Sequence, residues 1–174
     1  GVTNEIFDNR QLSIGYFDLS AGLLYSGSTN GYNNFYFGAS MYHLNRPKES
    51  FQGGQYILNT RTTLQAGGRI PVGSYHYFHL AAIHSMQANA TNTVLGGAFS
   101  YNVNSSDEDP VNIYLGSWYR LKDALIPYVR LEFKGFRLGA SYDANTSLLR
   151  PATNTRGGME ISLIYIKQPS DPSL

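Results

Sequence analysis

Hydrophobic and polar residues alternate along most of this chain with a period of two, which places successive side chains on opposite faces of a β-strand. Residues 136–142, with the sequence FRLGASY, show this alternation clearly. No long window carries the spacing of an amphipathic helix. The alternation predicts about nine strands, at residues 17–25, 35–42, 58–70, 75–86, 91–101, 113–120, 127–133, 136–143 and 159–165.

Turn-forming residues separate the predicted strands. They lie at residues 27–33, 71–74, 105–110 and 134–135. The chain has 174 residues, which fits a single domain, residues 1–174. We expect the strands within residues 11–166, followed by a polar tail at residues 167–174.

The composition narrows the class of protein. Charged residues make up 14% of the chain, against about a quarter in ordinary soluble domains, and aromatic residues make up another 14%. The formal net charge of +1 gives no reason to expect a nucleic-acid partner. Because the chain has no Cys, disulfides, Cys-based zinc sites and thiol catalysis are ruled out. We expect no metal, no cofactor and no enzymatic activity.

One face of the predicted strands is apolar, and the opposite face carries charged side chains. The charged positions are Arg61, Arg69, Arg130, Glu132, Arg137, Asp143 and Glu160. A soluble β-sandwich also alternates in this way, but three features favour an antiparallel transmembrane β-barrel. The strands approach the length of about 9–11 residues that a tilted strand needs to cross a bilayer. Tyr and Phe gather near strand ends, as in an interfacial aromatic girdle, and Lys is scarce.

Four stretches, taken in order, resemble signatures of the PorP/SprF family of outer-membrane proteins. They are residues 17–25 (FDLSAGLLY) with 34–40 (NFYFGAS), 116–120 (GSWYR), 139–143 (GASYD) and 158–163 (GMEISL). The resemblance covers roughly residues 11–166. It implies an outer-membrane barrel of the type IX secretion and gliding machinery that helps to display or anchor secreted surface proteins. It implies no catalysis.

The predicted strand number leaves a sheet edge to be paired. Every strand edge within lipid needs a partner, and single-chain bacterial barrels have even strand numbers. Nine strands therefore predict the C-terminal portion of a larger barrel of about 14 strands, completed by a further segment or a second chain. A small closed barrel of eight strands is the alternative. If the C-terminus is periplasmic, the turns at residues 71–74 and 134–135 face the periplasm, and the loops at 44–57 and 143–157 face outward.

Two groups of residues are candidate sites. Enclosed charges need partners, so the seven charged positions predict an ion-pair network in the lumen, with Arg130, Glu132, Arg137 and Glu160 as possible partners. The network either fills the barrel structurally or lines a pathway. The outer loop predicts a surface for a protein partner, because exposed aromatic residues beside Arg are typical of interfaces. Its candidate residues are Arg46, Lys48, Glu49, Phe51 and Tyr56. An unengaged loop is the alternative.

The histidines do not predict a metal site. His76 and His79 point to opposite faces of one strand. His76 and His84 share a face but lie about 27 Å apart along the strand, at about 3.4 Å per residue.

The expected function is therefore that of a non-enzymatic barrel in the outer membrane of a Gram-negative bacterium. Its expected partners are the lipid bilayer and either a secreted surface protein or other subunits of the secretion machinery. One alternative is an outer-membrane channel for small solutes. The other is a soluble β-sandwich or lipocalin-like binding module, which would bury the apolar face.

Overall fold

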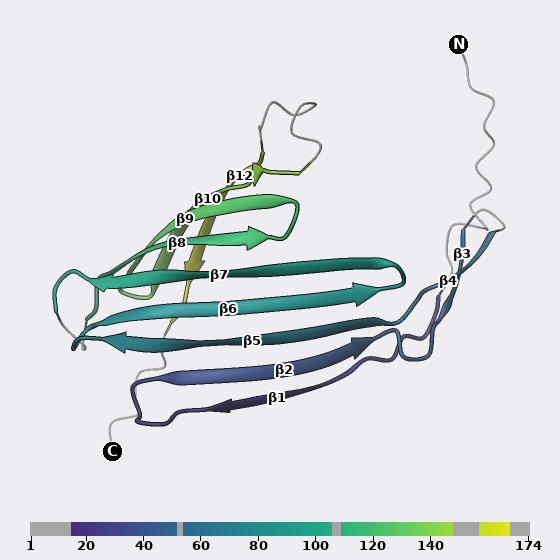
Figure 1. The fold of residues 1–174 in the computed structure, drawn as a ribbon, viewed down its shortest axis with the longest axis horizontal. Helices are drawn as coiled ribbons and strands as arrows, with labels where there is room; N and C mark the ends of the chain where they lie inside the picture. The colour runs from purple at the N-terminus through teal and green to yellow at the C-terminus, as the bar shows by residue number, and fades with distance from the viewer. Residues whose placement is uncertain (1–14, 52–53, 106–108, 148–156, 168–174) are drawn as a thin grey trace, which may run out of the picture.

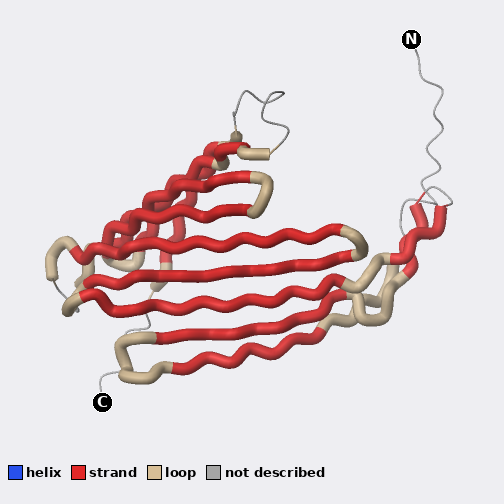
Figure 2. The backbone as a smooth tube through the Cα atoms, in the orientation of Figure 1, coloured by secondary structure: helices blue, strands red, loops and turns tan. Residues whose placement is uncertain are grey.

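The computed structural model describes residues 15–51, 54–105, 109–147 and 157–167. Within these segments the protein consists of β-strands and connecting turns (Figures 1 and 2). No described element is a helix with the length and hydrophobicity needed to span a membrane. The predicted polar tail at residues 168–174 lies outside the described residues.

One antiparallel sheet contains most of the strands, in the order β1-β2-β5-β6-β7-β8-β9-β10-β12. These strands are β1 (Ala21–Gly27), β2 (Asn34–Tyr42), β5 (Arg61–Val72), β6 (His76–Gln87), β7 (Ala90–Asn102), β8 (Asn112–Arg120), β9 (Ala124–Phe133), β10 (Phe136–Tyr142) and β12 (Met159–Tyr165). The short β11 (Ala144–Asn145) pairs with β9. A separate hairpin of β3 (Lys48–Phe51) and β4 (Gly54–Ile57) projects beyond one end of the sheet (Figure 1).

The sheet is a curved wall that does not close on itself among the described residues. Strands β5 to β7 run side by side across the view, and β9, β10 and β12 turn steeply away from them (Figures 1 and 2). Strands β1 and β12 each have one neighbour in the described sheet. The predicted all-β, antiparallel architecture is therefore confirmed.

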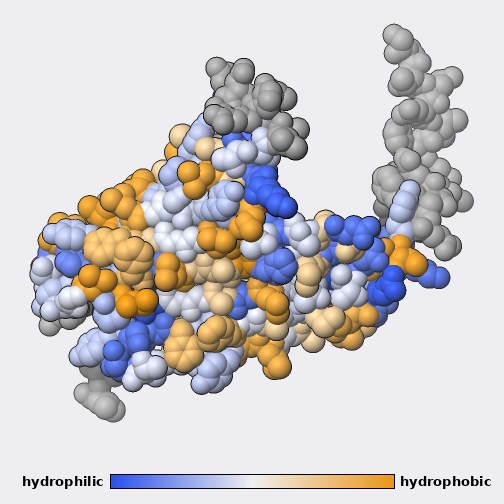
Figure 3. All heavy atoms as spheres, in the orientation of Figure 1, coloured by the Kyte–Doolittle hydropathy of each residue, from blue (hydrophilic) through white to orange (hydrophobic). Residues whose placement is uncertain are grey.

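The register separates the side chains into two faces of opposite character. Cross-strand partners share a face, so the rows can be followed from strand to strand. One such row is Phe37, Ala66, Ala82, Leu95, Tyr119 and Leu125. We call the face that carries this row the outer face and the opposite one the inner face. Hydrophobic residues gather over β8 to β12 in Figure 3, whereas hydrophilic residues gather near the β3–β4 hairpin.

Burial is inverted relative to a soluble protein. The most buried residues of the sheet all lie on the inner face and are small or polar: Thr63, Ser85, Ala98, Ser100, Asn102, Tyr114 and Ala124. Large outer-face side chains are exposed, among them Phe37 at 58%, Leu115 at 62% and Leu163 at 69%. A soluble sandwich buries its apolar face, so that alternative is wrong.

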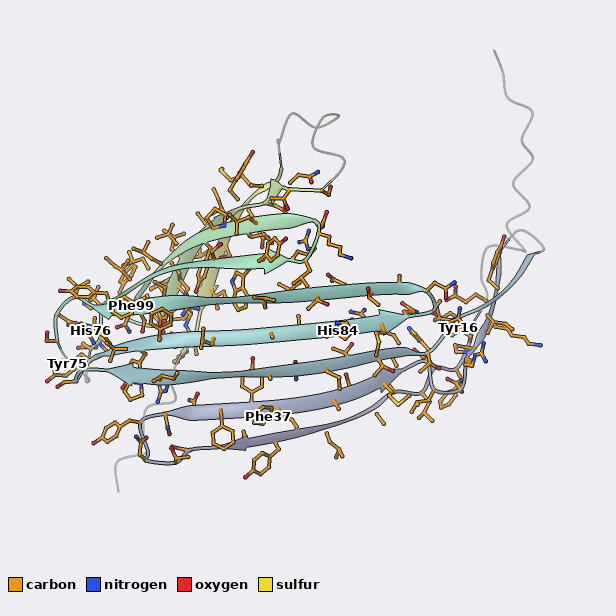
Figure 4. The ribbon with its side chains drawn as sticks, in the orientation of Figure 1. Tyr16, Phe37, Tyr75, His76, His84 and Phe99 are labelled. Atoms are coloured by element: carbon orange, nitrogen blue, oxygen red, sulfur yellow. The ribbon has the colours of Figure 1, made fainter. Side chains whose placement is uncertain are left out.

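Aromatic residues gather on the outer face at the end of the sheet formed by the turns after β1, β5, β7 and β9. His76 stacks on Tyr101 with ring centroids 4.6 Å apart, and Phe78 lies 5.9 Å from Phe99. Figure 4 shows His76 and Phe99 at this end and His84 near the other end of β6. Hydrophobic positions such as Leu80 and Ala82 lie between the two histidines, so the outer face has an apolar band with polar and aromatic borders.

Several strand boundaries differ from the sequence expectation. The first strand was expected at residues 17–25, but β1 begins at Ala21, and residues 15–20 lie outside the sheet. β5 continues through Pro71, which pairs with Tyr77 near the strand end, where a missing donor is tolerated. Pro127 was expected to open a strand but is the fourth residue of β9. The β3–β4 hairpin lies in a segment expected to be a loop, because its four-residue strands are too short to show a clear alternation.

Candidate functional site

All seven predicted lumen residues project from the inner side of the sheet or from its end. The register places Arg61, Arg69, Arg130, Glu132, Arg137 and Glu160 on the inner face, and Asp143 follows β10 directly. The register thus gives six of the seven residues one shared face, and Asp143 lies beyond the end of β10. The alternation in the sequence does not predict which of them make contact.

Glu132 is the centre of one ion-pair group. Its carboxylate accepts a hydrogen bond from Nε of Arg137 at 3.0 Å and lies 3.6 Å from a terminal nitrogen of Arg130. Strands β9 and β10 form a two-residue hairpin through Lys134 and Gly135, both with positive φ, and this turn places Glu132 opposite Arg137. The pair borders a cavity of about 400 Å³ that Lys134 and Lys167 also line.

Asp143 belongs to a different group at the opposite end of the sheet. It lies 3.2 Å from Arg120, which also pairs with Asp123 at 2.9 Å. Glu160 lies opposite Ser141 in the register, whereas Arg137 lies opposite Ile164. Four residues along the strand separate the positions of Glu160 and Arg137, so the register does not place these two possible partners side by side. The seven residues do not form one network.

The inner-face arginines have aromatic partners that the alternation alone does not predict. Arg130 lies over the ring of Tyr114 at 3.8 Å, and Arg69 lies over the ring of Tyr77 at 4.7 Å. Arg61 lies farther from its ring, that of Tyr42, at 5.8 Å. The strict alternation of β6 and β8 could have placed both closer tyrosines on the inner face, but the contacts depend on strand register.

The predicted partner-surface loop forms a projecting lobe with the segment before β1. The side chain of Asn45 donates to the carbonyl of Phe17 at 2.6 Å and accepts from the backbone N–H of Leu19 at 3.0 Å. Nδ1 of His43 lies 2.9 Å from the Asp18 carboxylate. These contacts attach residues 17–19 to the start of the loop that contains β3 and β4.

Exposed aromatic and charged side chains cover this lobe. In the β3–β4 register Glu49 lies opposite Tyr56, which is 63% exposed, and Phe17 is 75% exposed. The side chain of Arg46 donates to Asn59 at 3.2 Å. A hydrogen bond to Glu49, followed by the negative charge of Glu49, raises the pKa of Tyr16, which lies beside the hairpin in Figure 4. The lobe therefore presents aromatic rings beside charges of both signs.

The described residues bring together no group of three or more His, Asp or Glu side chains able to hold a metal ion. His43, His76, His79 and His84 instead take part in separate contacts. His84, for example, lies 2.7 Å from the hydroxyl of Thr93.

An apolar outer face, a polar inner face and a projecting lobe at one end define the wall of a membrane β-protein. A family model described as "Type IX secretion system membrane protein PorP/SprF" matches residues 2–165. The chain therefore belongs to the PorP/SprF family of type IX secretion system membrane proteins, as its motifs indicate. No curated protein matches it.

Proposed function

We propose that this chain is a non-enzymatic outer-membrane component of the type IX secretion and gliding machinery. In this role it anchors secreted surface proteins or assists their display. The observation that supports the role best is the lobe of residues 15–19, 43–51 and 54–60, which extends beyond the sheet while the sheet itself presents an apolar band. A rigid wall in lipid can thus hold an aromatic surface clear of the membrane.

The lobe has the composition of a protein interface. Tyr16, Phe17 and Tyr56 are exposed close to Arg46 and Lys48, and aromatic residues with Arg are the usual anchors of protein partners. Contacts such as the two hydrogen bonds of Asn45 hold the lobe in shape. A preformed surface loses less conformational entropy on binding than a flexible loop does.

Site-specific photo-crosslinking in the native host tests this proposal. A benzoylphenylalanine introduced at Tyr56 should capture a secreted surface protein or another subunit of the machinery. The matched control is Phe37, an aromatic residue of the outer face with similar exposure, where the same probe should react with lipid. Capture of the same protein from both positions, or from neither, would contradict the assignment of the lobe.

The variant Tyr56→Ala supplies the functional readout. It should lower the amount of secreted protein on the cell surface severalfold while the level of this chain in the membrane stays unchanged, because an exposed side chain contributes little to folding. Unchanged surface display would count against a role for the lobe.

A further inference from the structure

We propose that the inner face holds a binding site for a sugar ring, in a hollow over β5, β6 and β7, which run side by side in Figure 1. The ligand class is a neutral pyranose. The site lies on the sheet, apart from the projecting lobe, and does not depend on the function proposed for that lobe.

The first observation is a row of small residues between two aromatic side chains. The small residues are Gly67, Ala81 and Gly96, which face one another across β5, β6 and β7. Tyr36 of β2 lies opposite the first glycine, and Trp118 of β8 lies opposite the second. Two glycines and one methyl group between two large rings leave a hollow on the inner face, with Ala81 at its floor.

The second observation is that both rings lie against the sheet. A Cβ atom on Gly67 would lie 2.6 Å from the ring of Tyr36, and one on Gly96 would lie 2.7 Å from the ring of Trp118. Each ring therefore covers the glycine opposite it and leans toward Ala81 from its own side. An aromatic ring over a glycine of the adjacent strand is a common way to fix sheet register. It leaves the second face of the ring open to the space inside the curved wall.

The neighbouring row contributes a third ring and a polar group. Tyr128 of β9 covers Gly116 in the same way, with 2.6 Å between its ring and a Cβ atom on that glycine. Gly116 lies opposite Ala98, which lies opposite His79. Nε2 of His79 lies 3.2 Å from the hydroxyl of Ser100, which leaves Nδ1 free to bind a ligand.

These side chains border a single cavity of about 200 Å³. Tyr36, Trp118 and Tyr128 line it together with His79 and Asn34. The three rings are half-buried, as expected for rings that are covered on one face only. The cavity is large enough for one six-membered sugar ring.

The lining favours a neutral ligand with an apolar face and a polar rim. No charged side chain is among the described residues that line the cavity. Aromatic cages also bind cations, but Arg69 lies opposite His79 in the register and its charge opposes a cation. The C–H groups of a pyranose face can pack on the aromatic faces. The hydroxyls of Tyr36 and Tyr128, which bond to no other described residue, can bind the sugar hydroxyls.

Trp118 makes the site measurable, since it is the single Trp of this sequence and lines the cavity. The full chain is folded in a detergent without a sugar headgroup, such as octyl tetraethylene glycol ether, and titrated with glucose, galactose, mannose or N-acetylglucosamine. At least one of these pyranoses should change Trp118 emission in a saturable manner. Half-saturation is expected at about 1–10 mM, as for a small ligand in an open cavity. Sorbitol, an open-chain polyol, and choline, a cation, should leave the emission unchanged.

The variants Tyr36→Leu and Tyr128→Leu should each weaken sugar binding by about tenfold, because each removes one ring and one hydroxyl. The matched control is Tyr42→Leu. Tyr42 lies on the same strand and face as Tyr36, about 20 Å away at about 3.4 Å per residue, and should not affect binding. Ala81→Leu fills the floor of the hollow and should abolish the response to sugar while Trp118 still reports on the site.

Four results would overturn the proposal. One is the absence of a saturable response to all four pyranoses in the unsubstituted chain. The second is a response to sorbitol or choline as strong as that to the pyranoses, which would mean that the cavity does not recognise a neutral ring. The third is an equal loss of binding in the Tyr36 and Tyr42 variants.

The fourth result covers the case in which a Tyr→Leu variant does not fold. Tyr36→Phe keeps the ring over Gly67 and should lower the affinity by about threefold, because it removes one hydrogen bond. An affinity unchanged in both Tyr36→Phe and Ala81→Leu would show that the sugar binds elsewhere.

Discussion

At the scale of single residues, the inner face shows how polar side chains stabilise a wall whose apolar side faces outward. Thr63 and Ser85 are buried and lie 3.1 Å apart across β5 and β6. The carboxylate of Glu132 forms ion pairs with the guanidinium groups of Arg130 and Arg137. The partner of Thr63 lies on the adjacent strand, and Glu132 pairs with Arg137 of the adjacent strand and with Arg130 of its own strand. Polar groups shielded from water require such partners.

The position of Glu132 between two arginines gives a prediction about stability. Glu132→Gln removes a carboxylate that pairs with both cations, whereas Arg137→Gln removes one of its two partners. The groups are partly exposed, with side-chain exposures of 21–37%, so the expected losses in unfolding free energy are small. We expect about 1–2 kcal/mol for Glu132→Gln and about 0.5–1 kcal/mol for Arg137→Gln.

Unfolding of the folded chain by urea, followed by tyrosine and tryptophan emission, measures both variants. Glu49→Gln, a carboxylate of the hairpin outside the sheet, is the control and should change the midpoint little. Equal effects of all three substitutions would show that Glu132 does not organise the inner face.

At the scale of the elements, close backbone contacts explain the paired glycines in the middle of the long strands. A Cβ atom on Gly97 would lie 2.6 Å from the backbone oxygen of His79, and one on Gly116 would lie 2.5 Å from the backbone oxygen of Gly97. Contacts this short are not tolerated by real side chains. Strands β6, β7 and β8 can therefore approach and bend only where a side chain is absent.

Gly97→Ala tests this requirement. The added methyl group meets backbone rather than a flexible side chain, so β7 or β6 must shift, and overpacking of this kind typically costs about 1–3 kcal/mol of unfolding free energy. Gly15→Ala is the matched control, because no atom lies within 4 Å of its added Cβ. Thermal unfolding monitored by circular dichroism should show a lower midpoint for the first variant alone. A midpoint unchanged in Gly97→Ala would mean that the sheet can relax at this position.

The strands and their pairing show how far the sequence predicts the structure. Alternation locates seven strands of the sheet, because one apolar and one polar face leave a period-two pattern in them. The pattern at residues 75–86 and 91–101 is more mixed, although strands were expected there too. Alternation does not locate the β3–β4 hairpin, whose pairing depends on four residues per strand. It also cannot identify partners across strands: Asp143 pairs with Arg120, and Arg130 stacks on Tyr114, because of the register. The register is set by turns and packing along the whole sheet.

At the scale of the whole molecule, the two edges of the sheet run in the same direction. β1 and β12 are the first and the ninth strands of the antiparallel order, so the chain direction reverses an even number of times between them. Direct pairing of these edges would be parallel, so closure in the antiparallel pattern requires an odd number of further strands between them. This conclusion agrees with the even total strand number of bacterial membrane barrels.

The orientation of the two faces is the property on which the membrane assignment depends, and a spin-label scan along β6 tests it directly. Phe78, Leu80 and Ala82 lie on the outer face, and Tyr77, His79 and Ala81 alternate with them. In the chain reconstituted into lipid bilayers, labels at the outer positions should collide with dissolved oxygen and be protected from a water-soluble nickel complex. Labels at the inner positions should show much less contact with oxygen.

The histidines at the two borders of the apolar band allow a more specific prediction for the same labels. His76 and His84 share the outer face with Leu80, and they lie about 27 Å apart along the strand at about 3.4 Å per residue. The hydrophobic band of membrane barrels is about 25 Å tall. Protection from nickel should therefore be greatest at position 80 and fall toward positions 76 and 84. A label at Leu80 that nickel reaches as readily as it reaches one at Tyr56 on the hairpin would mean that the apolar face is not in contact with lipid.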